Sequence, residues 1–149
     1  MKVFVENEAG SNVKHLHDEK SLQVQGTMHV YRPYPFPYGF VLDTTAEDGD
    51  NADCFILTNT PLRTGEIVEC EPVALMEQIE DGQADHKVLA FLRGDERPVE
   101  RIPVAELTEF VTHVFEHIPG KSIAVGEFKD KDAALSYLHD CQDAKPTGR

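Results

Sequence analysis

The apolar residues of this chain change their spacing about two thirds of the way along it. Before residue 100 they form short runs between turns, and the continuous run at residues 54–57 is typical of a strand buried on both faces. Two longer runs predict a hairpin across an acidic loop at residues 80–85. Short strands with few helices between them predict a small barrel. The strand candidates are residues 3–5, 13–16, 22–24, 54–57, 67–70, 73–78 and 87–92.

The last third of the chain has the spacing of amphipathic helices. Apolar side chains recur at intervals of three and four from Leu107 to Ile118, which predicts a helix that begins near Pro103 and stops at Pro119. Residues 123–128 read as one more strand. A second, shorter helix is expected over about residues 132–141, with Asp130 or Asp132 as its cap. The predicted class is therefore α+β, mainly β.

Length and charge restrict the partners. The 149 residues contain no linker, which predicts one domain over 1–149 with a loose tail at about 143–149. Fourteen Lys and Arg against 27 Asp and Glu leave a net charge of −13. Such a field repels nucleic acids and anionic membranes, but a small phosphate ligand stays compatible because a metal ion inverts the charge locally.

The cysteines and the apolar runs predict a cytoplasmic protein. Three widely spaced cysteines without a Cys-x-x-Cys pair are expected as free buried thiols in a reducing compartment. No run approaches the roughly 18 apolar residues of a membrane span, and the first ten residues lack the apolar core of a signal peptide.

Four acids lie within seven residues on a turn that leads into the buried run: Glu47, Asp48, Asp50 and Asp53. Crowded carboxylates repel each other unless water or a cation neutralises them, and hard oxygen ligands suit Mg²⁺, Mn²⁺ or Ca²⁺. An EF-hand is excluded, because with Asp48 as the first ligand the required glycine position holds Asp53. A metal site and a solvated acidic turn both remain open.

Two further segments have a functional and a structural interpretation. Glu80, Asp81 and Asp85 form a second acidic group, which is either a solvated turn or part of the same site if the fold brings it near. The proline-rich segment 31–39 is too stiff to be helical. It either presents tyrosine hydroxyls to an anion, or binds a partner as a polyproline-like ligand, or forms a rigid connection.

These motifs, in this order, resemble the family I soluble inorganic pyrophosphatases. The family's Asp-Gly-Asp-Pro-x-Asp stands here as residues 48–53, and its Tyr-Pro-x-x-Tyr-Gly as residues 34–39. Its Asp-x-Lys matches residues 85–87, and its Phe-Glu-His matches residues 115–117. The register holds from about Val3 to Leu138. The resemblance implies a five-stranded OB-type β-barrel with two C-terminal α-helices, acting on pyrophosphate with Mg²⁺ or another divalent cation, in a homo-oligomer that is usually a hexamer in bacteria.

The resemblance also implies residue roles. Asp48, Asp53 and Asp85 would hold an activating metal pair, and Asp50 would orient and deprotonate the attacking water. Glu80 and Glu6 would help to hold metals that arrive with the substrate, with Asp81 as a substitute for Glu80. The implied phosphate ligands are Lys14, Tyr38 and Lys87, with Tyr34 supporting Asp50 or a neighbour.

The chain departs from the family pattern mainly at phosphate contacts. Gly26 stands where the family has an arginine, for which Arg32 is the nearest replacement. Ile118 and Pro119 replace a Tyr-Lys pair, before a shortened loop that carries Lys121, and Leu16 replaces a glutamate. Three functions stay open: a pyrophosphatase, a hydrolase of an organic di- or polyphosphate, and a non-catalytic metal- or phosphate-binding protein.

Overall fold

The computed structural model describes residues 1–144, and residues 145–149, part of the predicted tail, lie outside the described residues. Asp143 donates its backbone N–H to the carbonyl of Asp43 at 3.0 Å, so the chain is attached up to that point. The elements, in chain order, are β1 (Lys2–Asn7), β2 (Val13–His17), β3 (Val24–His29), β4 (Tyr38–Val41), β5 (Asp53–Ile56), β6 (Ile67–Glu80), β7 (Gln83–Ala84), β8 (Lys87–Leu92), α1 (Val104–His113), β9 (Ile123–Lys129) and α2 (Lys131–Cys141).

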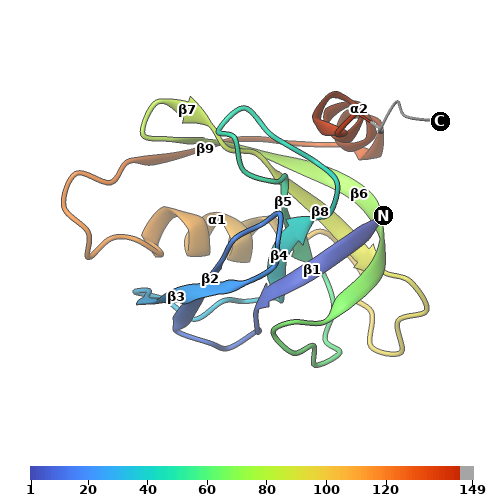
Figure 1. Cartoon of the computed structure of the whole chain (residues 1–149), viewed down its shortest axis with the longest axis horizontal. Helices are drawn as coiled ribbons and strands as arrows, with labels where there is room; N and C mark the ends of the chain where they lie inside the picture. The colour runs from blue at the N-terminus through green and yellow to red at the C-terminus, as the bar shows by residue number, and fades with distance from the viewer. Residues whose placement is uncertain (145–149) are drawn as a thin grey trace.

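Five strands close into a ring, which confirms the barrel prediction. The hydrogen-bonded order is β1-β4-β5-β8-β6, and β1 also pairs with β6 (Figure 1). β6 is 14 residues long, and register shifts after Pro72 and after Met76 let it bend and pair with β1, β8 and β9. The ladder between β5 and β8 is parallel. β2 and β3 form a separate two-stranded ribbon.

Alternation along β5 sends its side chains to two apolar clusters. Cys54 and Ile56 join small residues from every strand of the ring, which fill the barrel interior. Phe55 faces the other way, into a cluster with the buried residues of α1, among them Leu107 and Phe110. The prediction of a strand buried on both faces is thus confirmed. The cluster under α1 is also the wall on which the candidate site lies.

Three local predictions need correction. The first helix ends at His113, because the last turns before Pro119 tighten: Glu116 and Ile118 donate to carbonyls three residues back. The strand expected at residues 22–24 lies further along the chain, because Leu22 adopts a φ of 64° in a turn and β3 begins only at Val24. The proline-rich segment 31–39 runs into a strand, β4, which the sequence did not indicate. Only glycine fits at position 39, because a Cβ there would overlap the carbonyl oxygen of Phe4 on β1.

The other C-terminal predictions are confirmed. β9 covers the expected strand, and α2 begins after Asp130, whose side chain accepts a hydrogen bond from the Ala133 N–H at 3.1 Å. Cys54, Cys70 and Cys141 are free and buried. Neither helix in the described part of the chain has the length and apolar character needed to cross a membrane.

Candidate functional site

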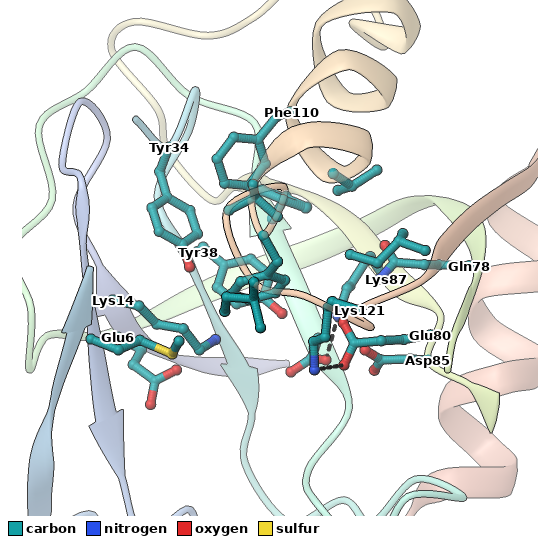
Figure 2. A pocket seen from close by; sticks show the side chains of 18 of the residues that line it. Glu6, Lys14, Tyr34, Tyr38, Gln78, Glu80, Asp85, Lys87, Phe110 and Lys121 are labelled. Atoms are coloured by element: carbon teal, nitrogen blue, oxygen red, sulfur yellow. Dashed lines mark hydrogen bonds and ion pairs between the residues drawn. The ribbon is translucent and has the colours of Figure 1, made fainter. Parts of the chain in front are cut away.

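A cavity of about 260 Å³ lies on the outer face of β5 and β8, beneath α1 and beside the β2–β3 ribbon (Figure 2). The structure brings eight of the ten predicted site residues to its wall, from six different segments. They are Glu6, Lys14, Tyr34, Tyr38, Asp53, Glu80, Asp85 and Lys87.

The centre of the site is a buried lysine between two aspartates. Asp53 is paired with Lys87 in the parallel ladder, because β5 and β8 begin side by side. The Lys87 Nζ atom lies 2.7 Å from Asp53 Oδ2 and 3.0 Å from Asp85 Oδ2, and only 7% of its side chain is exposed. Lys87 is the first residue of β8, and Asp85 lies two residues before it in the β7–β8 turn.

This cluster carries more negative than positive charge. Burial and the neighbouring Asp85 raise the pKa of Asp53, although Lys87 opposes them. Burial by itself lowers the pKa of Lys87, but the two aspartates outweigh it and raise the pKa above its ordinary value. Lys87 is therefore charged at all physiological pH values, and it does not fully neutralise its partners.

Two tyrosines form the floor of the site. The Lys14 Nζ atom lies 5.3 Å and the Lys87 Nζ atom 5.5 Å from the centre of the Tyr38 ring, within the range of cation–π attraction. Tyr34 packs against Tyr38 with ring centres 5.5 Å apart. Burial raises the pKa of both tyrosines, so their hydroxyl groups stay protonated and can donate to an anion.

Glu6 is held by a residue that the sequence analysis did not single out. The Glu6 Oε2 atom accepts from the backbone N–H of His17 at 3.1 Å and lies 3.2 Å from its Nδ1 atom. Burial raises the pKa of Glu6, and the nearby charge of Lys14 opposes the shift. The alternation of β2 puts Lys14 near the cavity, but no local pattern indicates that His17 orients a carboxylate.

Asp48 and Asp50 lie on the adjoining loop and do not line the cavity. The Asp48 Oδ1 atom accepts from the Asp50 N–H at 3.0 Å across a turn in which Gly49 has a φ of 88°. In residues 1–144, no three His, Cys, Asp or Glu side chains approach closely enough to hold a metal ion. Lys87 occupies the space between Asp53 and Asp85. The assignment of Asp48, Asp53 and Asp85 as metal ligands therefore remains a prediction.

The donor set of the cavity nevertheless fits divalent cations. Five carboxylates line it, and they face three lysines, Lys14, Lys87 and Lys121. Glu19 is the fifth acid, and burial together with the charges of Asp53 and Asp50 raises its pKa to about 8. Carboxylate oxygens in excess of cations are the donors that Mg²⁺ and Mn²⁺ prefer.

Comparison with known proteins identifies the family. The family model described as inorganic pyrophosphatase matches residues 3–145. An inorganic pyrophosphatase of Nanoarchaeum equitans is 30% identical over 150 residues, which cover 94% of this chain and 94% of the relative. The chain belongs to the inorganic pyrophosphatase family. An inorganic pyrophosphatase of Caulobacter vibrioides is 31% identical and covers 88% of the chain and 81% of the relative.

Solved structures agree with this assignment. The inorganic pyrophosphatase of Thermus thermophilus superposes with a TM-score of 0.81 at 27% identity, over 95% of this chain and 88% of that one. The inorganic phosphatase of Anaplasma phagocytophilum has a TM-score of 0.84 at 24% identity, over 95% of this chain and 90% of that one. These likenesses bear out the OB-type barrel with two helices.

Within this pyrophosphatase-family site, two charged residues lie in the chain close to positions at which the sequence departs from the family pattern. Glu19 brings a carboxylate to the cavity although Leu16 carries none, and its Oε1 atom accepts from the Asn51 N–H at 2.9 Å. Lys121 lines the cavity, and its Nζ atom lies 3.4 Å from Glu80 Oε2. Glu19 follows Leu16 by three residues, so its nearness in the sequence to that position is the signal that could have identified it.

Arg32 is not the replacement for the arginine that is missing at Gly26. Its guanidinium pairs with Glu109 of α1 at 2.8 Å, and it does not line the cavity. A Cβ at Gly26 would meet no atom within 4 Å, so the position leaves open space. The cations that line the cavity are all lysines.

Proposed function

We propose that this protein hydrolyses inorganic pyrophosphate to two phosphates with divalent metal ions, of which Mg²⁺ suits the donors best. The observation that carries the proposal is the buried group Asp53–Lys87–Asp85 at a cavity whose carboxylates outnumber its lysines. Membership of the inorganic pyrophosphatase family supports the same reaction. A protein of charge −13 does not bind so charged an anion without cations.

The carboxylates divide into two sets in this proposal. Asp48, Asp53 and Asp85 hold the activating metal ions, while Glu80 and Glu6 help to hold metal ions that arrive with the substrate. Metal ions supply charge neutralisation and a water of lowered pKa. Asp85 and Glu80 lie on opposite sides of the β6–β7 turn, which supports their sharing one region of the cavity.

The remaining residues act on the water and the phosphates. Asp50, an exposed residue on the loop that leads into β5, orients the attacking water and accepts its proton. Lys14 and Lys87 neutralise phosphate oxygens, and the protonated hydroxyl of Tyr38 donates to them. Tyr34 packs against Tyr38 and holds its ring in place.

The test is phosphate release from pyrophosphate with Mg²⁺, with wild type beside Asp50→Asn and a sample in chelator. We expect turnover that needs the metal and falls at least 100-fold in Asp50→Asn, as for loss of a catalytic base. Asp43→Asn, an exposed aspartate in an earlier turn of the same β4–β5 connection, is the matched control and should keep full activity. Folded, metal-bound wild type without turnover would overturn the proposal.

We further infer a homo-oligomer in the cytoplasm, a hexamer if the resemblance to bacterial family members extends to assembly. Apolar side chains exposed on separate elements, such as Val24, Val104 and Leu135, support a buried contact between copies. Sedimentation velocity tests this assembly, and a monomer at micromolar concentration would contradict it.

A further inference from the structure

One end of the cavity is apolar, although pyrophosphate has no apolar part. Phe115 and Ile118 follow α1, and Ile123 begins β9, and all three line the cavity while remaining partly exposed. They are thus reachable from the cavity and are not fully covered core residues. A charged anion with its cations gains nothing from such a wall, because burying ions against carbon leaves them without partners.

A buried amide interrupts this wall. Gln78 lines the cavity and is 2% exposed, and its Oε1 atom has no hydrogen-bond partner among residues 1–144. Its backbone N–H donates to His86 Nδ1 at 3.1 Å, so the residue is held firmly on β6. An unpaired buried acceptor is costly, and deprotonated phosphate oxygens cannot satisfy it because they are acceptors themselves.

The strand register places the amide beside both a carboxylate and the apolar wall. Glu80 pairs with Ile123 and Gln78 with Val125 in the β6–β9 ladder. Residues two apart on a strand face the same side, so Gln78 lies next to Glu80 and near Ile123. Figure 2 shows Gln78 and Glu80 at the same side of the cavity as Lys87. A ligand bound by the carboxylates and lysines therefore extends directly to the amide and the apolar wall.

We propose that this end of the cavity binds the organic group of a small diphosphate monoester, an apolar group with one hydroxyl that donates to Gln78. The proposal rests on the proposed function, because the diphosphate takes the place of pyrophosphate. A cavity of about 260 Å³ lies below the ~300–1,000 Å³ of sites for drug-sized ligands, which favours a short alkyl group over a nucleoside.

The reaction is the same hydrolysis with a different leaving group. The water oxygen forms a bond to the terminal phosphorus, and the bond from that phosphorus to the bridging oxygen breaks. The bridging oxygen leaves on the organic monophosphate. The products are inorganic phosphate and the organic monophosphate, which share the two protons of the water with the solvent.

The test compares four substrates in the presence of Mg²⁺: pyrophosphate, methyl diphosphate, isobutyl diphosphate and an isobutyl diphosphate that carries one hydroxyl. We expect kcat/KM for isobutyl diphosphate to exceed that for methyl diphosphate by about 10-fold or more, since added methylene groups bind in an apolar pocket. The hydroxylated probe should gain about a further fivefold from Gln78.

Two variants separate the apolar wall from the amide. Ile118→Lys should lower the ratio of isobutyl diphosphate to pyrophosphate turnover by about 10-fold. Gln78→Leu should abolish the preference for the hydroxylated probe over isobutyl diphosphate. This preference is the ratio of kcat/KM for the two probes, so a change in overall activity does not affect it. Ile67→Lys, at an exposed site where β6 begins, is the matched control and should change neither ratio.

The outcomes distinguish this inference from the proposed function. Pyrophosphate turnover with no hydrolysis of the organic diphosphates, and no competition by them, overturns the inference alone. If pyrophosphate is not hydrolysed, the subsite is tested by calorimetry. The experiment measures binding of isobutyl methylenediphosphonate, which cannot be hydrolysed, in the presence of Mg²⁺. Binding that Ile118→Lys weakens about 10-fold supports the subsite, and binding that is absent or unaffected overturns it.

Discussion

At the scale of single residues, Lys87 determines the electrostatics of the site. It is the counter-ion of two buried aspartates, at 2.7 and 3.0 Å, and it lies over the ring of Tyr38. A lysine in this position keeps the carboxylates close together when no metal neutralises them. Binding of metal ions to Asp53 and Asp85 would free the Lys87 ammonium group to bind a phosphate. The same side chain would then stabilise the metal-free protein and bind the substrate in the metal-bound one.

Lys87→Met should therefore destabilise the protein in the absence of divalent ions. Removing one partner of a buried ion pair leaves an uncompensated charge, and the expected loss in unfolding free energy is about 3–5 kcal/mol. Urea denaturation in chelator measures it. Lys129→Met removes an exposed lysine that pairs with Glu77 at 3.2 Å, and should cost less than about 1 kcal/mol. Equal losses in the two variants would contradict the role assigned to Lys87.

Glu19 predicts a pH dependence. Its pKa rises from 4.5 to about 8 on folding, because of burial and of the charges on Asp53 and Asp50. Between these values the folded protein holds a proton that the unfolded chain has lost, so the unfolding free energy falls as the pH rises through this range. The neutral side chain of Glu19→Gln avoids this loss.

In chelator, Glu19→Gln should exceed wild type in stability at pH 8.5 by roughly 2 kcal/mol, less than the full shift in pKa implies because water screens this partly exposed carboxyl group. The difference should vanish at about pH 4, where both states of wild type are protonated. Urea denaturation across this pH range measures the difference. Glu127→Gln, at an exposed position on β9, provides the comparison. A difference that is independent of pH would show that Glu19 is charged in the folded protein.

At the scale of elements, the loop between α1 and β9 is fastened to the β6–β7 turn. Asp81 and Ser122 exchange backbone and side-chain hydrogen bonds, each of 2.8 Å. The contact holds Lys121 against the cavity, with its Nζ atom 5.3 Å from the centre of the Phe115 ring. The loop after Ile118 thus delivers a cation to the site, although Pro119 stands where the family pattern has a lysine.

Asp81→Gly should release this loop and raise KM for pyrophosphate about five- to tenfold with less effect on kcat, since about 1 kcal/mol of positioning is lost. Glycine tolerates the φ of 53° at position 81, so backbone strain does not contribute. Asp81→Asn retains the acceptor and the conformation and loses only an exposed ion pair with Lys121 at 3.5 Å, so its KM should stay within about twofold of wild type. Steady-state kinetics would contradict the role of the loop if both variants changed alike.

At the scale of the whole molecule, the stability of the protein depends on bound cations, because its net charge is −13. The acids of the cavity come from β1, the turn after β2, β5, β6 and the β7–β8 turn, so a cation that binds them joins elements that are far apart in the chain. Binding to the folded state alone raises stability by mass action.

Saturating Mg²⁺ should accordingly raise Tm by about 5–10 °C, the shift expected for roughly 2.7 kcal/mol at 100 times the dissociation constant. Differential scanning calorimetry measures it, with NaCl of equal ionic strength as the reference. Asp53→Asn should lose most of the shift, whereas Asp43→Asn should keep it. An equal shift in both variants would mean that Mg²⁺ acts by general screening.

Much of the architecture was predictable because it depends on local patterns. Strand β9, a cap of α2 at either Asp130 or Asp132 and the burial of β5 on both faces follow from periodicity and capping, which act over a few residues, and the structure places the cap at Asp130. β4 was not predictable in this way. Prolines mask it, and the requirement for Gly39 comes from the carbonyl of Phe4, a residue on another strand.

The sequence by itself determined that acids crowd a turn before a buried strand, and that a barrel precedes two helices. Only the tertiary structure decided which charges meet. Asp53 and Lys87 are 34 residues apart and become neighbours through the parallel ladder of β5 and β8. Gln78, Glu19 and Lys121 enter the cavity through similar long-range packing. Such contacts depend on the free energy of the whole packed arrangement, whereas periodicity reports only which face of an element is apolar.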